Sequence, residues 1–478
     1  GAGASSGMAM AHWEIQGWMI LILGWVFVPF YTRSMVYTMP EFLERRYNPQ
    51  SRTILSVISL VSYVLTKVAV TVYAGGLVFQ QVFGIKELWG IDFFWIAAIG
   101  LVVLTALYTI FGGMKSVLYT SVLQTPILLL GSLIILVLGF KELGGWDEMM
   151  RVCGAVTVND YDDTMTNLIR SNDDANFPWL GALIGSAIIG FWYWCTDQFI
   201  VQRVLSGKNE MEARRGTIFG AYLKLLPVFL FLIPGMIAFA LHQKYIGAGG
   251  EGFLPMLANG TANADAAFPT LVAKLLPAGV KGLVVCGILA ALMSSLASLF
   301  NSSAMLFTID FYKRFKPETP EKKLVGIGQI ATIVIVVLGI LWIPIMRSVG
   351  DVLYTYLQDV QSVLAPGIAA AFLLGICWKR TSAQGGMWGL ISGMVIGLTR
   401  LGAKVYYSNA GEVADSTFKY LFYDMNWLFF CGWMFLFCII VVIVVSLATE
   451  APTAEKIQGL VFGTATKKQK AATRASWN

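Results

Sequence analysis

An apolar run carries an unusual cluster of hydroxyl side chains in the stretch LAALMSSLASLFNSSA, residues 289–304. Ser294 and Ser298 are four residues apart and share one helical face. Ser295 and Ser302 share a neighbouring face. Hydroxyl and carbonyl oxygens without a fixed charge suit a monovalent cation that must be released in every cycle. The alternative is a small-residue face that lets two helices approach closely, and the residue types alone favour neither.

Three further apolar stretches hold polar or aromatic side chains. Lys224 lies in GAYLKLLPVFLFLIPG, Gln358 and Gln361 lie in YLQDVQSVLAPG, and Tyr193 and Trp194 belong to GFWYWCTDQ. The lysine could instead snorkel to the membrane interface, the glutamines could bridge helices, and the rings could form an interfacial belt. Polar residues within a membrane are nevertheless functional candidates. Rings beside amides and charges suit a sugar, whose C–H face stacks on the rings.

The composition is that of a polytopic membrane protein. The chain of 478 residues is 57% hydrophobic and 13% charged, which is about half the charge of a soluble globular protein. Its six cysteines form no CxxC pair and lie mostly in apolar runs, so we expect them to pack in the core. The two histidines, His12 and His242, argue against a metal site or a histidine-based enzyme, and we expect no enzymatic activity.

Apolar segments long enough to cross a bilayer recur along the chain and predict an all-α fold. About eleven segments qualify, near residues 13–31, 53–84, 91–111, 116–139, 178–204, 215–242, 280–311, 324–348, 350–377, 384–406 and 425–448. Lysine and arginine concentrate on alternate connections, for example DFYKRFKPETPEKK, whereas the intervening connections are acidic or neutral. The positive-inside rule therefore assigns the basic connections to the cytoplasm.

Several stretches of the chain resemble those of a known family. The chain resembles the sodium/solute symporter family, in its sodium–glucose cotransporter branch of bacterial-type sodium/sugar symporters. The resemblance lies in LGWVFVPFY, VYTMPEFLERRY, TALYTIFGG, YWCTDQFIVQR, YLKLLPVFLFLIPGMI, LMSSLASLFNSSAMLFTIDFYKRF and APGIAAAFLLGICWKR, which keep the family's order over nearly the whole chain. It implies a leucine-transporter-like fold, which is an inverted five-plus-five helix repeat with its site at midplane, plus extra C-terminal helices.

The resemblance also implies a sodium site on the eighth core helix. The family's alanine carbonyl and two adjacent serine hydroxyls fall on Ala291, Ser294 and Ser295. Its remaining sodium ligands, and some sugar contacts, lie on core helix 1 just before GAGASSG. We therefore expect core helix 1 to be largely missing from this chain. We also predict a transmembrane domain over residues 1–449 and a segment, 450–478, that is a cytoplasmic tail or a linker to a missing final helix.

The sugar contacts of the family carry over to four further positions. Its sugar-binding lysine falls on Lys224 and its glutamine on Gln358. Its inner-gate tyrosine, which lies under the sugar, falls on Tyr193, with Trp194 beside it. The resemblance therefore implies a monosaccharide as the substrate and sodium as the co-transported ion.

An acidic sugar contact near the start of core helix 2 has an ambiguous register. Counted from GAGASSG it falls on Glu14, and counted back from LGWVF it falls on Trp13. We assign Glu14, because a carboxylate accepts hydrogen bonds from two hydroxyls. Two departures from the family concern a second ion: Ser121 stands where many members have aspartate, and Ala297 where many have a hydroxyl. Both remove an oxygen ligand or a charge, so we expect one sodium per sugar.

The leading hypothesis is a sodium-coupled hexose symporter of the glucose or galactose type that works by alternating access. A sodium/myo-inositol or other polyol symporter is the near alternative, and a solute sensor or channel of the same fold is a more distant one. We expect the lipid bilayer and a monosaccharide as partners and no nucleic acid. We also expect a functional monomer in the plasma membrane, which is the inner membrane of a bacterium.

Overall fold

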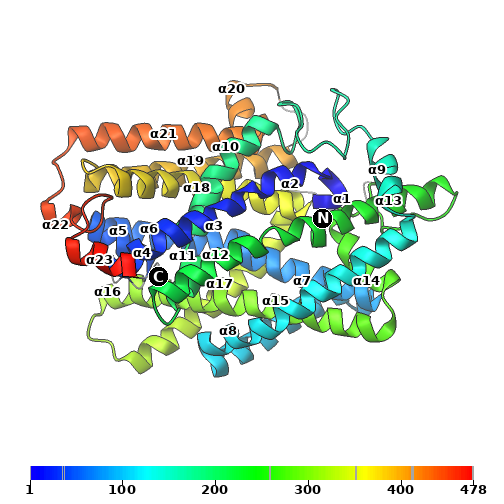
Figure 1. Cartoon of the computed structure of the whole chain (residues 1–478), viewed down its shortest axis with the longest axis horizontal. Coiled ribbons are helices and arrows are strands. Elements are labelled where there is room, and N and C mark those ends of the chain that lie inside the picture. The colour runs from blue at the N-terminus through cyan, green and yellow to red at the C-terminus, as the bar shows by residue number, and fades with distance from the viewer. Residues whose placement is uncertain are drawn as a thin grey trace.

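The computed structural model describes residues 2–34, 36, 38–257, 260–349, 352–410 and 414–475, which are folded almost entirely into helices (Figure 1). The α-helices are α1 Ala2–Ser6, α2 Ala9–Trp13, α3 Met19–Ile22, α4 Val28–Ser34, α5 Met39–Arg46, α6 Pro49–Ser62, α7 Ala69–Phe83, α8 Phe93–Leu143, α9 Trp146–Gly154, α10 Trp179–Gly190, α11 Gln198–Leu205, α12 Glu210–Leu223, α13 Ile233–Gly247, α14 Ala267–Leu275, α15 Ala278–Met305, α16 Lys313–Phe315, α17 Glu321–Val349, α18 Leu353–Cys377, α19 Ala383–Asn409, α20 Thr417–Lys419, α21 Trp427–Ala448, α22 Ala454–Ile457 and α23 Lys467–Ala475. The tighter 3₁₀ turns are η1 Glu14–Trp18 and η6 Ala264–Ala266, and the wider π turns are η2 Leu23–Phe27, η3 Tyr63–Val68, η4 Phe191–Thr196, η5 Val228–Leu232, η7 Leu306–Tyr312 and η8 Tyr420–Asp424. The short strands β1 Glu87–Leu88 and β2 Ile91–Asp92 pair antiparallel.

The predicted all-α membrane architecture is confirmed. In the described part of the chain, nine helical stretches are long and apolar enough to cross a membrane. The stretch Tyr356–Cys377 within α18 is the most buried of them, with 83% of its apolar window inside the protein, whereas Gln124–Leu143 at the end of α8 has 28%. The helix α18 therefore occupies the centre of the bundle, and the second half of α8 lies at its periphery.

Two of the expected spans are wrong in their boundaries. The segments 91–111 and 116–139 form one continuous helix, α8. The residues between them include two glycines but no proline, and a glycine costs a helix only about 1 kcal/mol, so the helix continues. The segment 384–406 lies within α19, which is helical as expected but is not among the nine apolar stretches.

Two of the spans are broken at polar residues. The span that begins with α10 ends at Asp197, whose extended backbone separates η4 from α11 and whose carboxylate caps Phe199 N at 3.1 Å. The span that begins with α12 is interrupted at Lys224. Pro227 explains the second break, because proline has no N–H to bond the carbonyl four residues earlier. Broken helices of this kind carry binding sites in secondary transporters.

The two ends of the bundle differ in charge. The helices α5, α16, α22 and α23 gather at the left of Figure 1, whereas α9 and the N-terminus lie towards the right. Arginine and lysine end α5 and fill α16. The C-terminal segment packs against this basic end, where Lys456 donates to Glu44 O at 2.9 Å and Phe462 N donates to Ile376 O at 2.9 Å. The positive-inside rule assigns this end to the cytoplasm.

Candidate functional site

Glu14 and Lys224 form an ion pair between helical segments far apart in the sequence. Glu14 begins the turn η1, and Lys224 directly follows the last residue of α12. The Lys224 ammonium donates to Oε2 of the Glu14 carboxylate, and the two side chains are 23% and 10% exposed. Removing either charge would leave the other poorly solvated, which is costly in an apolar bundle. The lysine thus points at a carboxylate inside the protein.

Gly17 makes room for this ion pair. In a 3₁₀ turn, residues three apart eclipse one another, so Gly17 lies directly beside Glu14 on η1. A Cβ atom at position 17 would lie 2.7 Å from Cγ of Lys224, which is closer than side-chain atoms approach. The absence of a side chain at this position therefore lets the aliphatic stem of Lys224 pass η1 and bring its ammonium to Glu14.

The other oxygen of Glu14 connects the pair to the central helix α18. The Tyr354 hydroxyl donates to Glu14 Oε1 at 3.1 Å, and Trp13 Nε1 donates to the Tyr354 hydroxyl at 3.2 Å. Trp13 is fully buried, with its ring edge-on to Trp427 at a centroid distance of 5.1 Å. Of the two residues to which the acidic sugar contact could be assigned, Glu14 is therefore the one that pairs with Lys224. Trp13 instead donates to the tyrosine that bonds Glu14.

Gln358 lies one turn along α18 from Tyr354, and its side-chain oxygen is a buried hydrogen-bond acceptor. Its side chain is 5% exposed, and its Oε1 has no hydrogen-bond partner among the residues that the structure describes. A buried polar atom without a partner costs free energy, about 1–3 kcal/mol. Such an atom is expected where a ligand or water completes the bonding.

Tyr193 and Trp194 lie on the π turn η4, next to the helix break. Turns of this type widen a helix locally and are frequent at functional sites. The two rings meet edge to face at 4.8 Å, and the Lys224 ammonium lies 6.0 Å from the Trp194 ring centroid. Trp194 Nε1 is buried and, within the described residues, without an acceptor. Trp194 and Lys224 also line a cavity of about 510 Å³ that reaches Arg203.

A second buried ion pair, which the sequence analysis missed, supports the break from the other side. Lys67 on η3 pairs with Asp197, and their side chains are 9% and 3% exposed. The Tyr63 hydroxyl donates to the same carboxylate at 2.9 Å, and the Lys67 ammonium lies 5.1 Å from the Tyr193 ring centroid. The signal was available in the sequence, because Lys67 stands alone in the long apolar run 53–84. Asp197 thus caps the start of α11 and pairs with the ammonium that lies beside the Tyr193 ring.

The hydroxyls of α15 do not all face the same way. Ser294 is buried and lies 2.7 Å, oxygen to oxygen, from the Ser121 hydroxyl on α8. Ser295 is exposed and Ala291 is half-buried. Of the two serine hydroxyls that the family resemblance assigns to sodium, one therefore bonds to α8 and the other lies at the surface of the bundle.

The hydroxyls further along α15, those of Ser298 and Ser302, have a packing role. Helix packing was the alternative to a cation site for this cluster. The Ser298 hydroxyl accepts a hydrogen bond from Arg203, and the Ser302 hydroxyl accepts one from Gln202. Both donors belong to α11, the helix that follows the break at Asp197. These bonds therefore attach α15 to α11 just beyond the candidate ion ligands. Ala297, which lies between the two groups, is fully buried.

Broken membrane helices that meet at a site near the middle of the bundle are typical of secondary transporters. The family described as "Sodium:solute symporter family" matches residues 1–393. The chain belongs to this family, so it is an integral membrane protein and sodium is the ion that it co-transports.

Relatives and a solved structure agree with this assignment. Human "Sodium/myo-inositol cotransporter 2" is 36% identical over 477 residues, which cover 97% of this chain and 70% of that protein. Human "Sodium/glucose cotransporter 4" is 37% identical over 481 residues, which cover 97% and 69%. The substrate-bound, outward-open structure of a Na⁺-coupled sialic acid symporter superimposes with a TM-score of 0.70 at 20% identity, over 95% of this chain and 86% of that one. This likeness confirms the fold.

Proposed function

We propose that the protein is a sodium-coupled hexose symporter that works by alternating access, with its sugar site at Glu14, Lys224, Gln358, Tyr193 and Trp194. The observation that carries the proposal is the convergence of the Glu14–Lys224 pair with two buried polar atoms, Gln358 Oε1 and Trp194 Nε1, that lack partners among the described residues. A hexose has hydroxyl donors and acceptors for all four groups. Its C–H face matches the neighbouring rings.

The ion pair allows the protein to change conformation when no sugar is bound. Without sugar, the Lys224 ammonium and the Glu14 carboxylate neutralise each other, so the bundle can close without an isolated buried charge. With sugar bound, hydroxyls donate to the carboxylate and accept from the ammonium. The same two groups therefore serve both the loaded and the empty conformations that alternating access requires.

Sodium binds, in this proposal, at the carbonyl of Ala291 and the hydroxyls of Ser294 and Ser295. The bonds from α11 to Ser298 and Ser302 would pass the effect of ion binding on to the helix break beside Tyr193. Ion binding and sugar binding would then favour the same conformation, which is the requirement for coupling.

A myo-inositol symporter is the second candidate, because relatives from several mammals are named for that solute. A hexose differs from myo-inositol by its ring oxygen and its hydroxymethyl group. In proteoliposomes with one inward sodium gradient, we expect labelled glucose or galactose to enter with a kcat/KM at least about tenfold above that of myo-inositol. The opposite order would assign the site to polyols and leave sodium coupling intact.

We expect a stoichiometry of one sodium per sugar. A second ion needs its own oxygen cage and a nearby carboxylate to offset its charge. At the relevant positions, the Ser121 hydroxyl bonds to Ser294 and Ala297 has no side-chain oxygen. Reversal potentials in proteoliposomes measure this ratio. A sugar flux that reverses where two sodium ions balance one sugar would contradict the claim.

We further propose a functional monomer in the plasma membrane, which in a bacterium is the inner membrane. All groups of the proposed sugar site come from one chain, which supports the monomer. A solute sensor or channel of this fold is the remaining alternative. It predicts sugar binding without accumulation against a gradient, so the same proteoliposomes distinguish it.

A further inference from the structure

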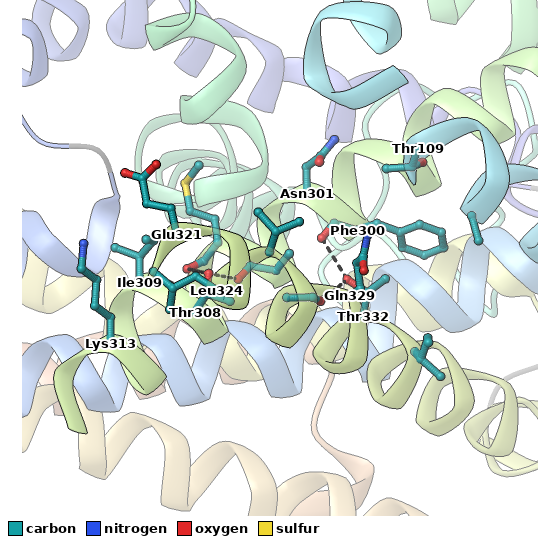
Figure 2. Close-up of a pocket in the computed structure, with 16 residues that line it drawn as sticks. Thr109, Phe300, Asn301, Thr308, Ile309, Lys313, Glu321, Leu324, Gln329 and Thr332 are labelled. Carbon is teal, nitrogen blue, oxygen red and sulfur yellow. Dashed lines mark hydrogen bonds between the residues drawn. The ribbon is translucent and has the colours of Figure 1, made fainter. Parts of the chain in front are cut away.

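A membrane-embedded groove lies away from the proposed sugar and sodium sites, between α17 and the helix formed by α15, η7 and α16 (Figure 2). Its volume is about 570 Å³, within the range of ligand sites, about 300–1,000 Å³. Ala106 and Thr109 of α8 also line it. Ile333 on its rim is 63% exposed and belongs to an apolar span with 33% of its window buried, so the groove opens towards the lipid.

The walls of the groove are more apolar than their residue types indicate. Phe300 and Leu324 contribute hydrocarbon directly. The hydroxyl of Thr308 donates to Ala304 O at 2.5 Å, and that of Thr332 donates to Gly328 O at 2.9 Å. Both hydroxyls are thus satisfied by carbonyls of their own helices. Along Thr308 and Thr332, a hydrocarbon chain therefore strips no water from an unsatisfied donor.

Opposite charges mark one end of the groove. Lys313 and Glu321 lie at the same end in Figure 2, whereas Phe300 and Thr109 lie at the other. Within the part of the chain whose side chains the structure describes, neither Lys313 nor Glu321 forms an ion pair. This is the basic end of the bundle, which the positive-inside rule places at the cytoplasmic headgroup layer.

We propose that this groove binds a phospholipid with a phosphoethanolamine headgroup. An acyl chain would occupy the apolar walls. The phosphate would accept hydrogen bonds from the Lys313 ammonium, and the primary ammonium of the lipid would donate to the Glu321 carboxylate. A choline headgroup cannot donate such a bond, and a glycerol headgroup brings no cation to Glu321. The charge complementarity therefore selects ethanolamine over both.

The binding test uses the purified full chain, stripped of lipid in detergent and titrated with palmitoyl-oleoyl phosphatidylethanolamine under native mass spectrometry. We expect this lipid to bind more tightly than the matching phosphatidylcholine or phosphatidylglycerol, by about twofold to fivefold. Glu321→Gln should abolish that preference, and Lys313→Gln should weaken the binding of all three lipids. Equal binding of the three lipids to the wild type, or tighter phosphatidylglycerol, would overturn the headgroup assignment.

Two matched variants test the groove itself. Ile333→Trp fills it, whereas Ile330→Trp places the same ring at an equally exposed position of α17 outside the groove. We expect Ile333→Trp to weaken lipid binding at least about tenfold and Ile330→Trp to leave it unchanged; equal effects would overturn the proposal. Asn301→Leu should retain or strengthen binding, because the buried Asn301 Nδ2 has no partner among the described residues. Loss of binding in Asn301→Leu would instead show a polar occupant.

Discussion

Replacing Lys224 with alanine should weaken sugar affinity about tenfold to a hundredfold, with a much smaller effect on sodium affinity. The variant removes a charged hydrogen-bond donor to the sugar, and such bonds contribute about 1.5–3 kcal/mol. It also leaves the Glu14 carboxylate, 10% exposed, without its partner. The measurement is the sugar concentration for half-maximal uptake at saturating sodium, compared with a direct binding titration.

Matched variants separate this role from a structural one. Lys208→Ala removes an exposed lysine just before α12 and should change nothing. Gln358→Leu removes an acceptor on α18 that has no partner among the described residues, together with the bond of this side chain to Tyr354, and should weaken sugar binding about twofold to tenfold. Unchanged sugar affinity in Lys224→Ala would show that the lysine serves only the Glu14 ion pair.

Replacing Ser295 with alanine should abolish sodium-dependent uptake while the protein remains folded, and Ser294→Ala should do the same. Each variant removes one of few oxygen ligands from a stretch that has no carboxylate. Because Ser295 is exposed, its loss breaks no packing contact that would itself unfold the helix. The measurement is uptake as a function of sodium concentration, with thermal unfolding as the check on folding.

Ser303→Ala is the control for the sodium prediction. Ser303 lies further along α15, and its buried hydroxyl has no hydrogen-bond partner among the described residues. Its removal should leave the sodium dependence unchanged. If Ser294→Ala and Ser295→Ala also kept the wild-type sodium dependence, the serines of this helix would be packing residues, as Ser298 and Ser302 already are.

The sequence predicted the fold class because hydropathy and family motifs extend over the whole chain. It failed at α8, where two separate apolar runs were expected to be two spans and the structure has one helix. Hydropathy measures the length of apolar runs, and a helix that continues between two apolar runs leaves no signal in that measure. The breaks at Asp197 and Lys224 had clearer local causes, a capping carboxylate and a proline.

The candidate site was predictable only where single residues were unusual in their surroundings. Lys224 and Gln358 stood out as polar residues in apolar runs, and Glu14 followed from the family resemblance. Tyr354, which joins Glu14 to α18, was missed because a tyrosine near a helix end is common. The pairing itself was also beyond the sequence, since Glu14 and Lys224 are 210 positions apart and nothing local specifies their contact.

The central claim is that a sodium gradient drives sugar uptake through this chain. The most direct test loads proteoliposomes with potassium, applies an external sodium gradient and follows labelled glucose and galactose over time. We predict that one of these sugars accumulates transiently above its external concentration, and that replacing external sodium with potassium removes the accumulation. Uptake that proceeds equally in potassium, or that stops when the internal and external sugar concentrations are equal despite the sodium gradient, would contradict the account.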